Sequence, residues 1–489
     1  MRKVIDLQME FWKKNIADIE FDLQSRDEIP KLLMGLQYIY STTSVRKKVF
    51  EILTQLVPKK SQKTGRPGMD LWKILVLGTL RLNCNWDYDK VLEMANNHSQ
   101  LREMLGHSKI DFDSQYALQT IRDNIVLLTP AILDEINQTV LKTGHRLISP
   151  NQDPELRGSC DSFVVETDVH YPTDTNLLFD AMRKMISLIA IICSEIKITA
   201  WRQSHHNTLK IKRLLRGIQR LKRSTSKDEA KKQKRDQLII EKHQNYVEVC
   251  QGFISKVKET IHILRELGLL SIGQELRLIT IEEYIGHAER QIDQIRRRVV
   301  FGEKIPHKEK VFSVFEPHTE WISKGKAGVP QELGLKVCVL KDQYGFLLHH
   351  RIMQRQTDDK VAVNMVKEAK DRFVNLVSCS FDKGFYTPDN KSHLAKILDY
   401  VVLPKKGRLS AKDKEIEQSY EFVESRRKHS AVESSINALE NHGLDRCLDH
   451  GLHGFERYVA LSVLARNIQI LGHMLQQKEL KKQKRRKAA

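Results

Sequence analysis

The chain has 489 residues, of which 40% are hydrophobic and 29% are charged. This composition supports a globular fold of two to four domains and excludes a wholly disordered chain. Lys and Arg number 81 against 62 Asp and Glu, a net charge of +19, which favours a polyanionic partner. A basic soluble protein without such a partner is the alternative, and an anionic membrane surface is a weaker one.

Cysteine usage and hydropathy narrow the cellular setting. The seven cysteines are widely spaced, which excludes CxxC zinc sites and gives no disulfide framework, as in a reducing cytosol. The longest apolar run, "MISLIAIIC" at 185–193, is shorter than the roughly 20 residues that a membrane span needs. The N-terminal segment is charged throughout, so we expect no signal peptide, no membrane partner and a cytoplasmic protein.

The first part of the chain is dominated by helical periodicity. The spacing of apolar residues predicts helices at about 45–57, 71–82, 87–95, 113–128 and 130–144. We therefore expect residues 1–148 to form an all-α N-terminal domain. The second and third of these helices are joined by a short turn, which fits a helix-turn-helix or a plain helical hairpin equally well.

A strand followed by a long helical segment comes next. "SFVVETDVHYPTD" has the composition of a strand, which Pro172 should end. Helix follows from Asn176 to about Ile192, and only helical patterns, dense in Lys and Arg, continue to about residue 300. The pattern predicts a helical insertion at 179–305, folded as a long hairpin or coiled arm.

Period-two alternation resumes after the insertion. Strands are predicted at 333–340, 346–353, 374–382 and 400–407, with "KDQYG" (341–345) as a hairpin turn and helices from 357, near 393–398, at 420–441 and at 455–476. This order predicts an α/β core with a mixed sheet covered on both faces. We place the core at 149–178 and 306–475, and a solvated basic tail at 476–489.

Several acidic residues lie near the predicted strand ends, where active sites form in open α/β sheets. Asp382 ends the predicted strand 374–382, and Glu433 borders the apolar stripe of its helix. The opening strand carries two candidates, Asp161 and Asp168, and strand alternation alone does not choose between them. The plain alternatives are an Asp382 that caps a turn and a Glu433 on an exposed helix face. Acids from two strands and a helix suit a two-metal phosphodiester enzyme, because Mg²⁺ takes carboxylate and phosphate oxygens.

Five segments resemble bacterial insertion-sequence transposases of the DDE class (ISNCY-like). "DSFVVETDVHYPTDTNLLFDAMR" resembles the block with the first acid, and "SFDKGFY" resembles the second acidic block. "HSAVESSINALENHGLDRCLDHGLHGFERYVALSVLARNI" resembles the Glu-bearing helix and the following G-x-x-G-F region. "HKEKVFSVFEPHTEWISKGKAG" and "GRPGMDLWKILVLGTLRL" resemble two further segments. The resemblance runs from about residue 45 to 472, and its blocks are specific in combination.

The resemblance implies a ribonuclease H-like catalytic domain with Asp161, Asp382 and Glu433 as the catalytic and metal-binding triad. Two Mg²⁺ ions, with Mn²⁺ as a substitute, are the implied cofactors. Asp161 is preferred to Asp168 because the acid that opens the family block is the catalytic one. The implied activity is DNA strand cleavage and strand transfer at the ends of an insertion sequence. The implied partners are double-stranded DNA, as terminal inverted repeats and target, and further copies of the chain in a dimer or larger assembly at the nucleoid.

The sequence departs from the family pattern in two ways. A long stretch of chain separates Asp161 from Asp382, which we ascribe to the insertion. Positions 429 and 440 are His and Glu, so the Tyr-Arg-Glu-Lys signature of some relatives is not matched. A basic run next to position 429 is then the candidate source of positive charge: Arg426, Arg427 and Lys428.

Other functions and other residues stay open. The alternatives are a nuclease of the same fold without joining activity and a non-catalytic, domesticated DNA-binding protein; a zinc enzyme is disfavoured, because no H-E-x-x-H pattern occurs. DNA binding is expected from the N-terminal helices with "KKSQKTGRPG" (59–68) and from the basic insertion. Further candidates are Lys324 and Lys326 as phosphate ligands, Glu166 and His170 as supports of the site, and Asp174 as a helix cap.

Overall fold

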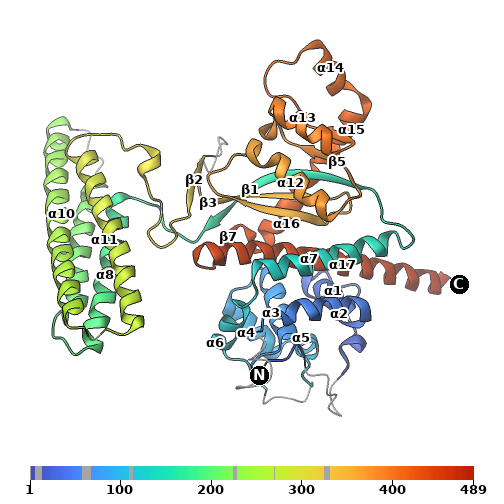
Figure 1. Ribbon diagram of the computed structural model, residues 1–489, viewed down its shortest axis with the longest axis horizontal. Helices are drawn as coiled ribbons and strands as arrows, with labels where there is room; N and C mark the ends of the chain where they lie inside the picture. Colours follow the sequence, from blue (N-terminus) through green and yellow to red (C-terminus); the bar gives the residue numbers. More distant parts are fainter. Residues whose placement is uncertain are drawn as a thin grey trace. The chain divides into compact units, whose positions relative to one another are not determined.

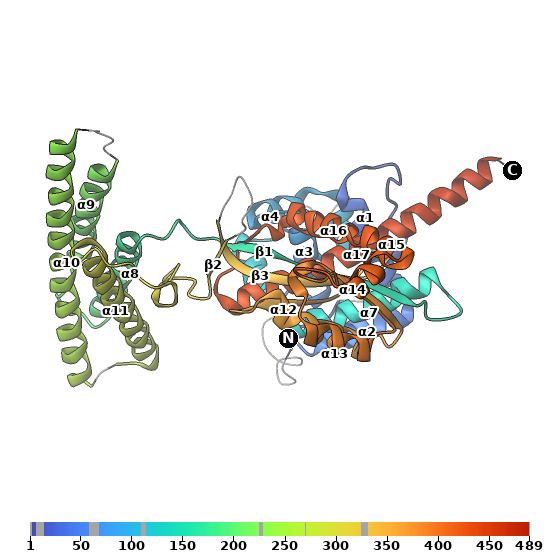
Figure 2. The same ribbon diagram turned by 90° about the horizontal axis from the view of Figure 1, so that it is seen from above.

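The computed structural model describes residues 2–5, 14–57, 68–108, 114–223, 228–268, 270–323 and 331–488. The chain divides into two compact units. The sheet unit comprises Met1–Asp168 and Ile322–Ala489, and the helical unit comprises Val169–Trp321. Figures 1 and 2 show the elements of each unit.

The sheet is mixed, as the sequence predicts. Its strands are β1 (Leu156–Thr167), β2 (Glu320–Ser323), β3 (Gln331–Lys341), β4 (Leu347–Met353), β5 (Leu376–Phe381), β6 (Tyr400–Val402) and β7 (Arg446–Cys447). The order is β2-β3-β1-β5-β6, with β4 also paired to β3 and β7 to β1. β1 runs antiparallel to β3 and parallel to β5, and β5 is parallel to β6. The short strands β2 and β7 were not predicted, because so few residues show no periodicity.

Helices cover both faces of this sheet. Those of the sheet unit are α1 (Glu28–Ser41), α2 (Thr43–Thr54), α3 (Leu71–Asn83), α4 (Tyr88–Asn97), α5 (Ser99–Met104), α6 (Leu118–Ile125), α7 (Pro130–Ile148), α12 (Asp358–Arg372), α13 (Pro388–Ile397), α14 (Ala411–Gln418), α15 (Tyr420–His429), α16 (Ala431–Leu439) and α17 (Gly451–Ala488). In Figure 1, α7 and α17 lie on one side of the sheet and α12 and α13 on the other. Short turns of other helix types occupy Ile16–Asp18, Lys383–Phe385 and Glu440–Leu444.

The N-terminal helices do not have a core of their own, which corrects the expected separate domain at 1–148. One continuous hydrophobic core joins residues of α1 to α7 with Phe163 and Val165 of β1, with β3 and with α16 and α17. α3 is buried along its whole length and is the central helix of this core. A helix buries its apolar stripe against the elements next to it. For the N-terminal helices, one of these elements is the C-terminal helix α17.

The expected basic tail at 476–489 is exposed over residues 481–486, but it is helical and not a separate segment. α17 is 38 residues long and continues through it to Ala488. Gln476 is still buried, whereas residues 481–486 are exposed. Lys, Arg, Gln, Leu and Ala all favour helix, so the basic end of the chain extends α17 into solvent.

The helical unit contains the predicted helical segment and extends beyond 179–305 at both ends. Its described residues form four helices around a common core, and not the expected long hairpin or coiled arm. Its helices are α8 (Asp174–Glu195), α9 (Ser204–Lys222), α10 (Glu229–Glu266) and α11 (Ile272–Val299), with a short turn at His307–Glu309. They enclose a second hydrophobic core. Thr173, not Asp174, caps α8, and Asp174 in the first turn pairs with Arg298 at 2.8 Å. Among the described helices of the chain, none is long and apolar enough to cross a membrane.

Candidate active site at the end of β1 and β5

Two of the predicted acids lie side by side on neighbouring strands. The parallel ladder of β1 and β5 ends with Cys160 opposite Phe381. Asp161 is the next residue of β1, and Asp382 directly follows the end of β5. Asp382 keeps an extended backbone, with φ −78° and ψ 163°. Neighbouring strands are about 4.8 Å apart, and equivalent positions share a face. Asp161 and Asp382, the acid pair, therefore lie together on one face of the sheet.

Glu433 comes to the same face from a helix. It stands in the first turn of α16, which packs against β1. Val432, Ile436 and Leu439 form the buried stripe of α16, as predicted, and Glu433 itself is exposed. Its charge acts on Asp161 and on His429. The structure thus brings the third acid into electrostatic range of the acid pair.

The environment of Asp161 is unfavourable for its charge. Burial, the largest cause, and the charges of Asp382, Asp358 and Glu433 together raise the pKa of Asp161 to about 6, although the hydrogen bond from the Ser162 amide lowers it. Like charges that share a site oppose ionisation. A divalent cation between these carboxylates would relieve that repulsion.

The acid pair suits Mg²⁺ in chemistry, although the site is not a closed ligand cage. Within the described ranges, no group of three or more His, Cys, Asp or Glu side chains is arranged to hold a metal ion. Mg²⁺ is usually bound by only one or two carboxylates, together with water and substrate phosphate. Asp161 and Asp382 meet that requirement, and the third ligand Glu433 and a second ion remain expectations.

The rival candidates near the end of β1 have partners of their own. Asp168 is exposed beyond the end of β1, with an oxygen 3.8 Å from Nη1 of Arg446. Glu166 accepts from Nη2 of the same arginine at 3.0 Å. His170 belongs to the helical unit, where its Nε2 lies 2.5 Å from Oδ2 of Asp180. Asp161, and not Asp168, therefore occupies the junction with β5.

A hydrogen-bonded group of Ser162, Asp358 and Lys336 next to Asp161 has no signal in the local sequence pattern. The Ser162 amide donates to Oδ1 of Asp161 at 2.8 Å, and the Ser162 hydroxyl donates to Oδ1 of Asp358 at 2.6 Å. Nζ of Lys336 lies 3.1 Å from Oδ2 of Asp358. Asp358 had been interpreted only as part of a helix start. Its contacts join β1, β3 and α12, so no local pattern could reveal them.

A groove of about 850 Å³ opens beside the acid pair. Its polar lining includes Arg157, Ser159, Lys341, Tyr344, Ser380 and Lys428. Lys341, Ser159 and Ser380 form a row across β3, β1 and β5, because Ser159 pairs with both of the others. This polar row lies two residues before the acid pair on the same strands. Oγ of Ser380 is 3.0 Å from Oγ of Ser159 and 2.9 Å from Nδ1 of His429.

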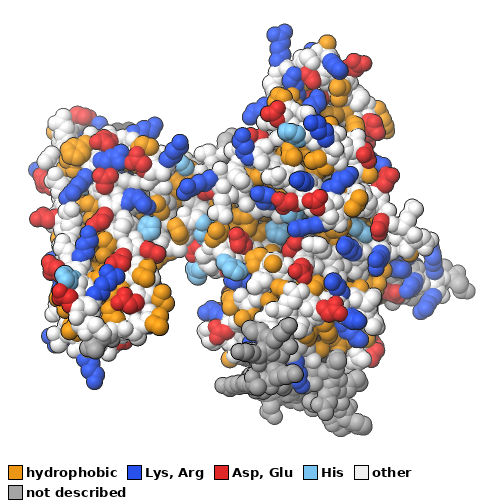
Figure 3. Space-filling model, in the orientation of Figure 1, with side chains coloured by type: hydrophobic (Ala, Val, Ile, Leu, Met, Phe, Trp, Pro, Cys, Tyr) orange, Lys and Arg blue, Asp and Glu red, His pale blue; other side chains and the backbone are white. Residues whose placement is uncertain are grey.

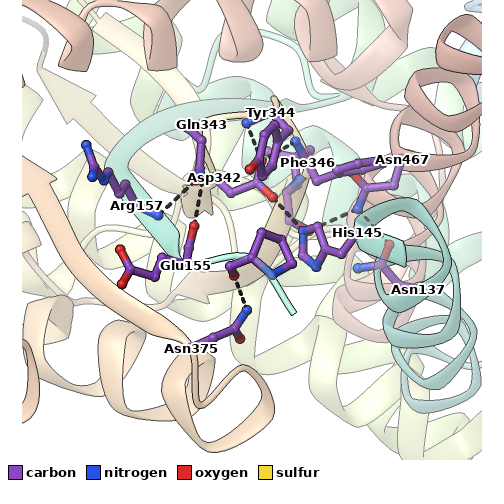
Figure 4. A network of polar contacts seen from close by, with 12 residues as sticks. Asn137, His145, Glu155, Arg157, Asp342, Gln343, Tyr344, Phe346, Asn375 and Asn467 are labelled. Carbon is purple, nitrogen blue, oxygen red and sulfur yellow. Dashed lines mark hydrogen bonds and ion pairs between the residues drawn. The ribbon is translucent and has the colours of Figure 1, made fainter. Parts of the chain in front are cut away.

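A buried network fixes the turn that follows Lys341 (Figure 4). Oδ2 of Asp342 lies 2.7 Å from Nε2 of His145 on α7, and Oδ1 accepts from the Tyr344 and Phe346 amides, both at 2.9 Å. The Asn467 side chain of α17 accepts from the Leu347 amide at 2.9 Å and donates to its carbonyl, also at 2.9 Å. The end of β3 is therefore held by two helices on one face of the sheet.

A basic face on α9 is a second candidate surface, in the helical unit. α9 contains six Lys and Arg residues and no acid. Five of them are exposed, and four of these recur at intervals of three or four residues, which places them on one face: Lys210, Arg213, Arg216 and Arg220. In the part of the chain that the structure describes, these four make no ion pair, whereas Lys231 and Lys232 at the start of the neighbouring α10 pair with Asp228 and Glu229. Figure 3 shows basic and acidic side chains interspersed over the helical unit on the face it draws.

Two predicted DNA-contacting segments lie outside the described residues. These are most of "KKSQKTGRPG" and the pair Lys324 and Lys326. Comparison with known proteins adds no relative: no protein-family model, curated protein or solved structure matches the chain.

Proposed function

We propose that the chain is a DDE-class transposase that cleaves and joins DNA strands at the ends of an insertion sequence. The observation that carries the proposal is the placement of Asp161 beside Asp382 at the end of the parallel β1–β5 ladder. The resemblance to the transposases assigns these same two acids, and Glu433 on α16 approaches the same face. The strand order supports a ribonuclease H-like core, because an antiparallel β4-β3-β1 ladder continues into parallel β5 and β6.

The residues of the chain have distinct tasks in this chemistry. Mg²⁺, when bound, supplies the positive charge that stabilises the attacking and leaving oxygens of the phosphodiester. Asp161 and Asp382 offer the ligand oxygens, and Glu433 adds a third. The Ser162 amide orients Asp161 through its 2.8 Å hydrogen bond. Water attacks the phosphorus and the P–O3′ bond breaks, which frees a 3′-hydroxyl. That hydroxyl then attacks a target phosphodiester, and one strand oxygen replaces another.

The proposed partner is double-stranded DNA, bound as terminal inverted repeats and as target by an assembly of at least two copies in the cytoplasm. The net charge of +19 and the unpaired basic face of α9 support this partner. Each phosphate neutralised by Lys or Arg releases counterions, which supplies affinity without sequence specificity.

The test compares Asp161→Asn and Asp382→Asn with Asp168→Asn. The substrate is a plasmid carrying the DNA that flanks the coding sequence, with Mg²⁺. We expect the first two variants to lose cleavage by roughly 10³-fold or more, because charge stabilisation in the transition state is lost. Asp168→Asn should stay close to the wild type. Cleavage that survives in Asp382→Asn would refute the site.

A precut end separates joining from hydrolysis. An oligonucleotide that already carries the free 3′-hydroxyl should be transferred to a target plasmid by the wild type. Cleavage without such transfer indicates the nuclease alternative. No effect of Mg²⁺ on DNA integrity indicates the non-catalytic DNA-binding alternative.

A further inference from the structure

Lys341 is a buried cation with no counter-ion among the residues that the structure describes. It is the last residue of β3 and only 7% exposed. Its Nζ donates to the Ala431 carbonyl at 2.8 Å, and no carboxylate of the described residues lies within 4 Å of it. The adjacent Asp342 is fully engaged with His145 and two backbone amides. A buried charge without a partner is costly, and burial lowers the pKa of Lys341 accordingly.

Lys341 lines the groove of about 850 Å³ beside the acid pair. Two other cations line the same groove, Arg157 and Lys428, and both are exposed. Neither makes an ion pair within the described part of the chain. The carboxylates of the lining are Glu155, at the exposed rim, and the already engaged Asp342. The groove therefore has a surplus of positive charge that an anion would neutralise.

An anion bound in the groove would lie close to Asp161 and Asp382. The polar row of Lys341, Ser159 and Ser380 lies two residues before Asp161 and Asp382, or about 7 Å along the strands. Its hydroxyls and ammonium are groups that bind phosphate oxygens. A volume of 850 Å³ lies within the range of about 300–1,000 Å³ that holds a small organic ligand. This volume is sufficient for a nucleotide of a single strand.

We propose that this groove binds the sugar-phosphate backbone of a single DNA strand next to the scissile phosphate, with Lys341 contacting one phosphate. The inference rests on the proposed function, since it assigns the polar row to the same substrate as the acid pair. Tyr344, exposed at the rim, presents an aromatic face on which a base can stack.

The test measures binding of the full-length protein to a labelled oligothymidine strand in EDTA, by fluorescence anisotropy across a series of salt concentrations. Lys341→Met should weaken binding about tenfold and lower the slope of log affinity against log salt by about 0.7, the value for one phosphate contact on a single strand. Lys428→Met, at an exposed position, should lower the slope similarly without any risk to folding. Lys396→Met removes an exposed charge on α13 outside the groove and should leave the slope unchanged.

Two results would overturn the inference. One is wild-type affinity and slope in both Lys341→Met and Lys428→Met. The other is an equal loss of affinity for a blunt duplex, which would place the contact on double-stranded DNA. Because EDTA prevents cleavage, the binding result is independent of the proposed activity. The groove can bind a strand even if the protein does not cleave DNA. Conversely, the protein can cleave DNA even if the groove does not bind a strand.

Discussion

Asp161 and Asp382 each stand one residue beyond the last ladder pair of two parallel strands, Cys160 and Phe381. The spacing of the two carboxylates is therefore set by backbone hydrogen bonds, although the residues lie far apart in the sequence. Glu433 depends instead on how α16 packs on β1. The acid pair is the rigid part of the site, and Glu433 is the part that side-chain rotation can adjust.

The raised pKa of Asp161 makes stability depend on pH. Its folded-state pKa is about 6 against 3.8 for the free group, so between these values the folded protein holds a proton that the unfolded chain has released. The free energy of unfolding should fall by at most about 3 kcal/mol as pH rises from about 4 to 6. Above pH 6 it should stay at this lower value. Asp161→Asn cannot ionise, so its stability relative to the wild type should rise over the same range.

Urea unfolding in EDTA at a series of pH values measures this difference, because titration of the groups that do not interact with Asp161 cancels between the two proteins. Mg²⁺ at pH 7.5 should then stabilise the wild type, since an ion that binds only the folded state adds to stability. The difference in free energy of unfolding between the wild type and Asp161→Asn should therefore become smaller. A difference between the two proteins that stays constant from pH 4 to 7 would contradict the assignment.

Local sequence patterns were sufficient to predict most strands and helices, and to predict that Asp382 lies at the end of a strand. Alternation indicated β3 and β4, mostly apolar runs indicated β5 and β6, and Asp382 directly follows β5. Lys341 was assigned to the hairpin turn instead, because only its pairing with Ser159 shows that β3 includes it. The β1–β5 ladder shows that Asp161, and not Asp168, lies next to Asp382, and local alternation does not contain this information.

Packing between distant segments was the part that sequence patterns could not supply. The apolar stripes of the N-terminal helices predicted buried faces but not their partners, so a shared core with α17 was missed. The helical conformation of the tail was missed for another reason. Its charge suggested a solvated segment, whereas its helix-favouring residues simply continue α17.

The basic face of α9 should contribute to duplex binding. Replacing Arg213, Arg216 and Arg220 together by Ala preserves helix propensity and removes three charges that have no acidic partner. Duplex affinity should fall, and its salt slope should decrease by up to about 3, at roughly 0.9 per phosphate contact. Filter binding or anisotropy over a salt series measures both quantities.

The matched control for α9 is Lys231→Ala with Lys232→Ala on the adjacent α10. These lysines are already paired with Asp228 and Glu229, so their loss should change the slope little. An unchanged slope in the α9 variant, or an equal change in the α10 control, would exclude α9 as a DNA-binding surface.

The contact of α1 with α17 should be intolerant of a single methyl group. A Cβ on Gly472 of α17 would lie 1.8 Å from the Lys31 carbonyl oxygen of α1, so two backbones touch there. Gly472→Ala should destabilise the sheet unit by about 2 kcal/mol, despite the better helix propensity of Ala. Gly217→Ala on α9 meets nothing within 4 Å and should stabilise by about 0.5–1 kcal/mol. Hydrogen exchange should show α1 and α3 loosened in Gly472→Ala, because they share one core with α17. Unchanged hydrogen-exchange protection of α1 and α3 would indicate that the N-terminal helices form an independent domain.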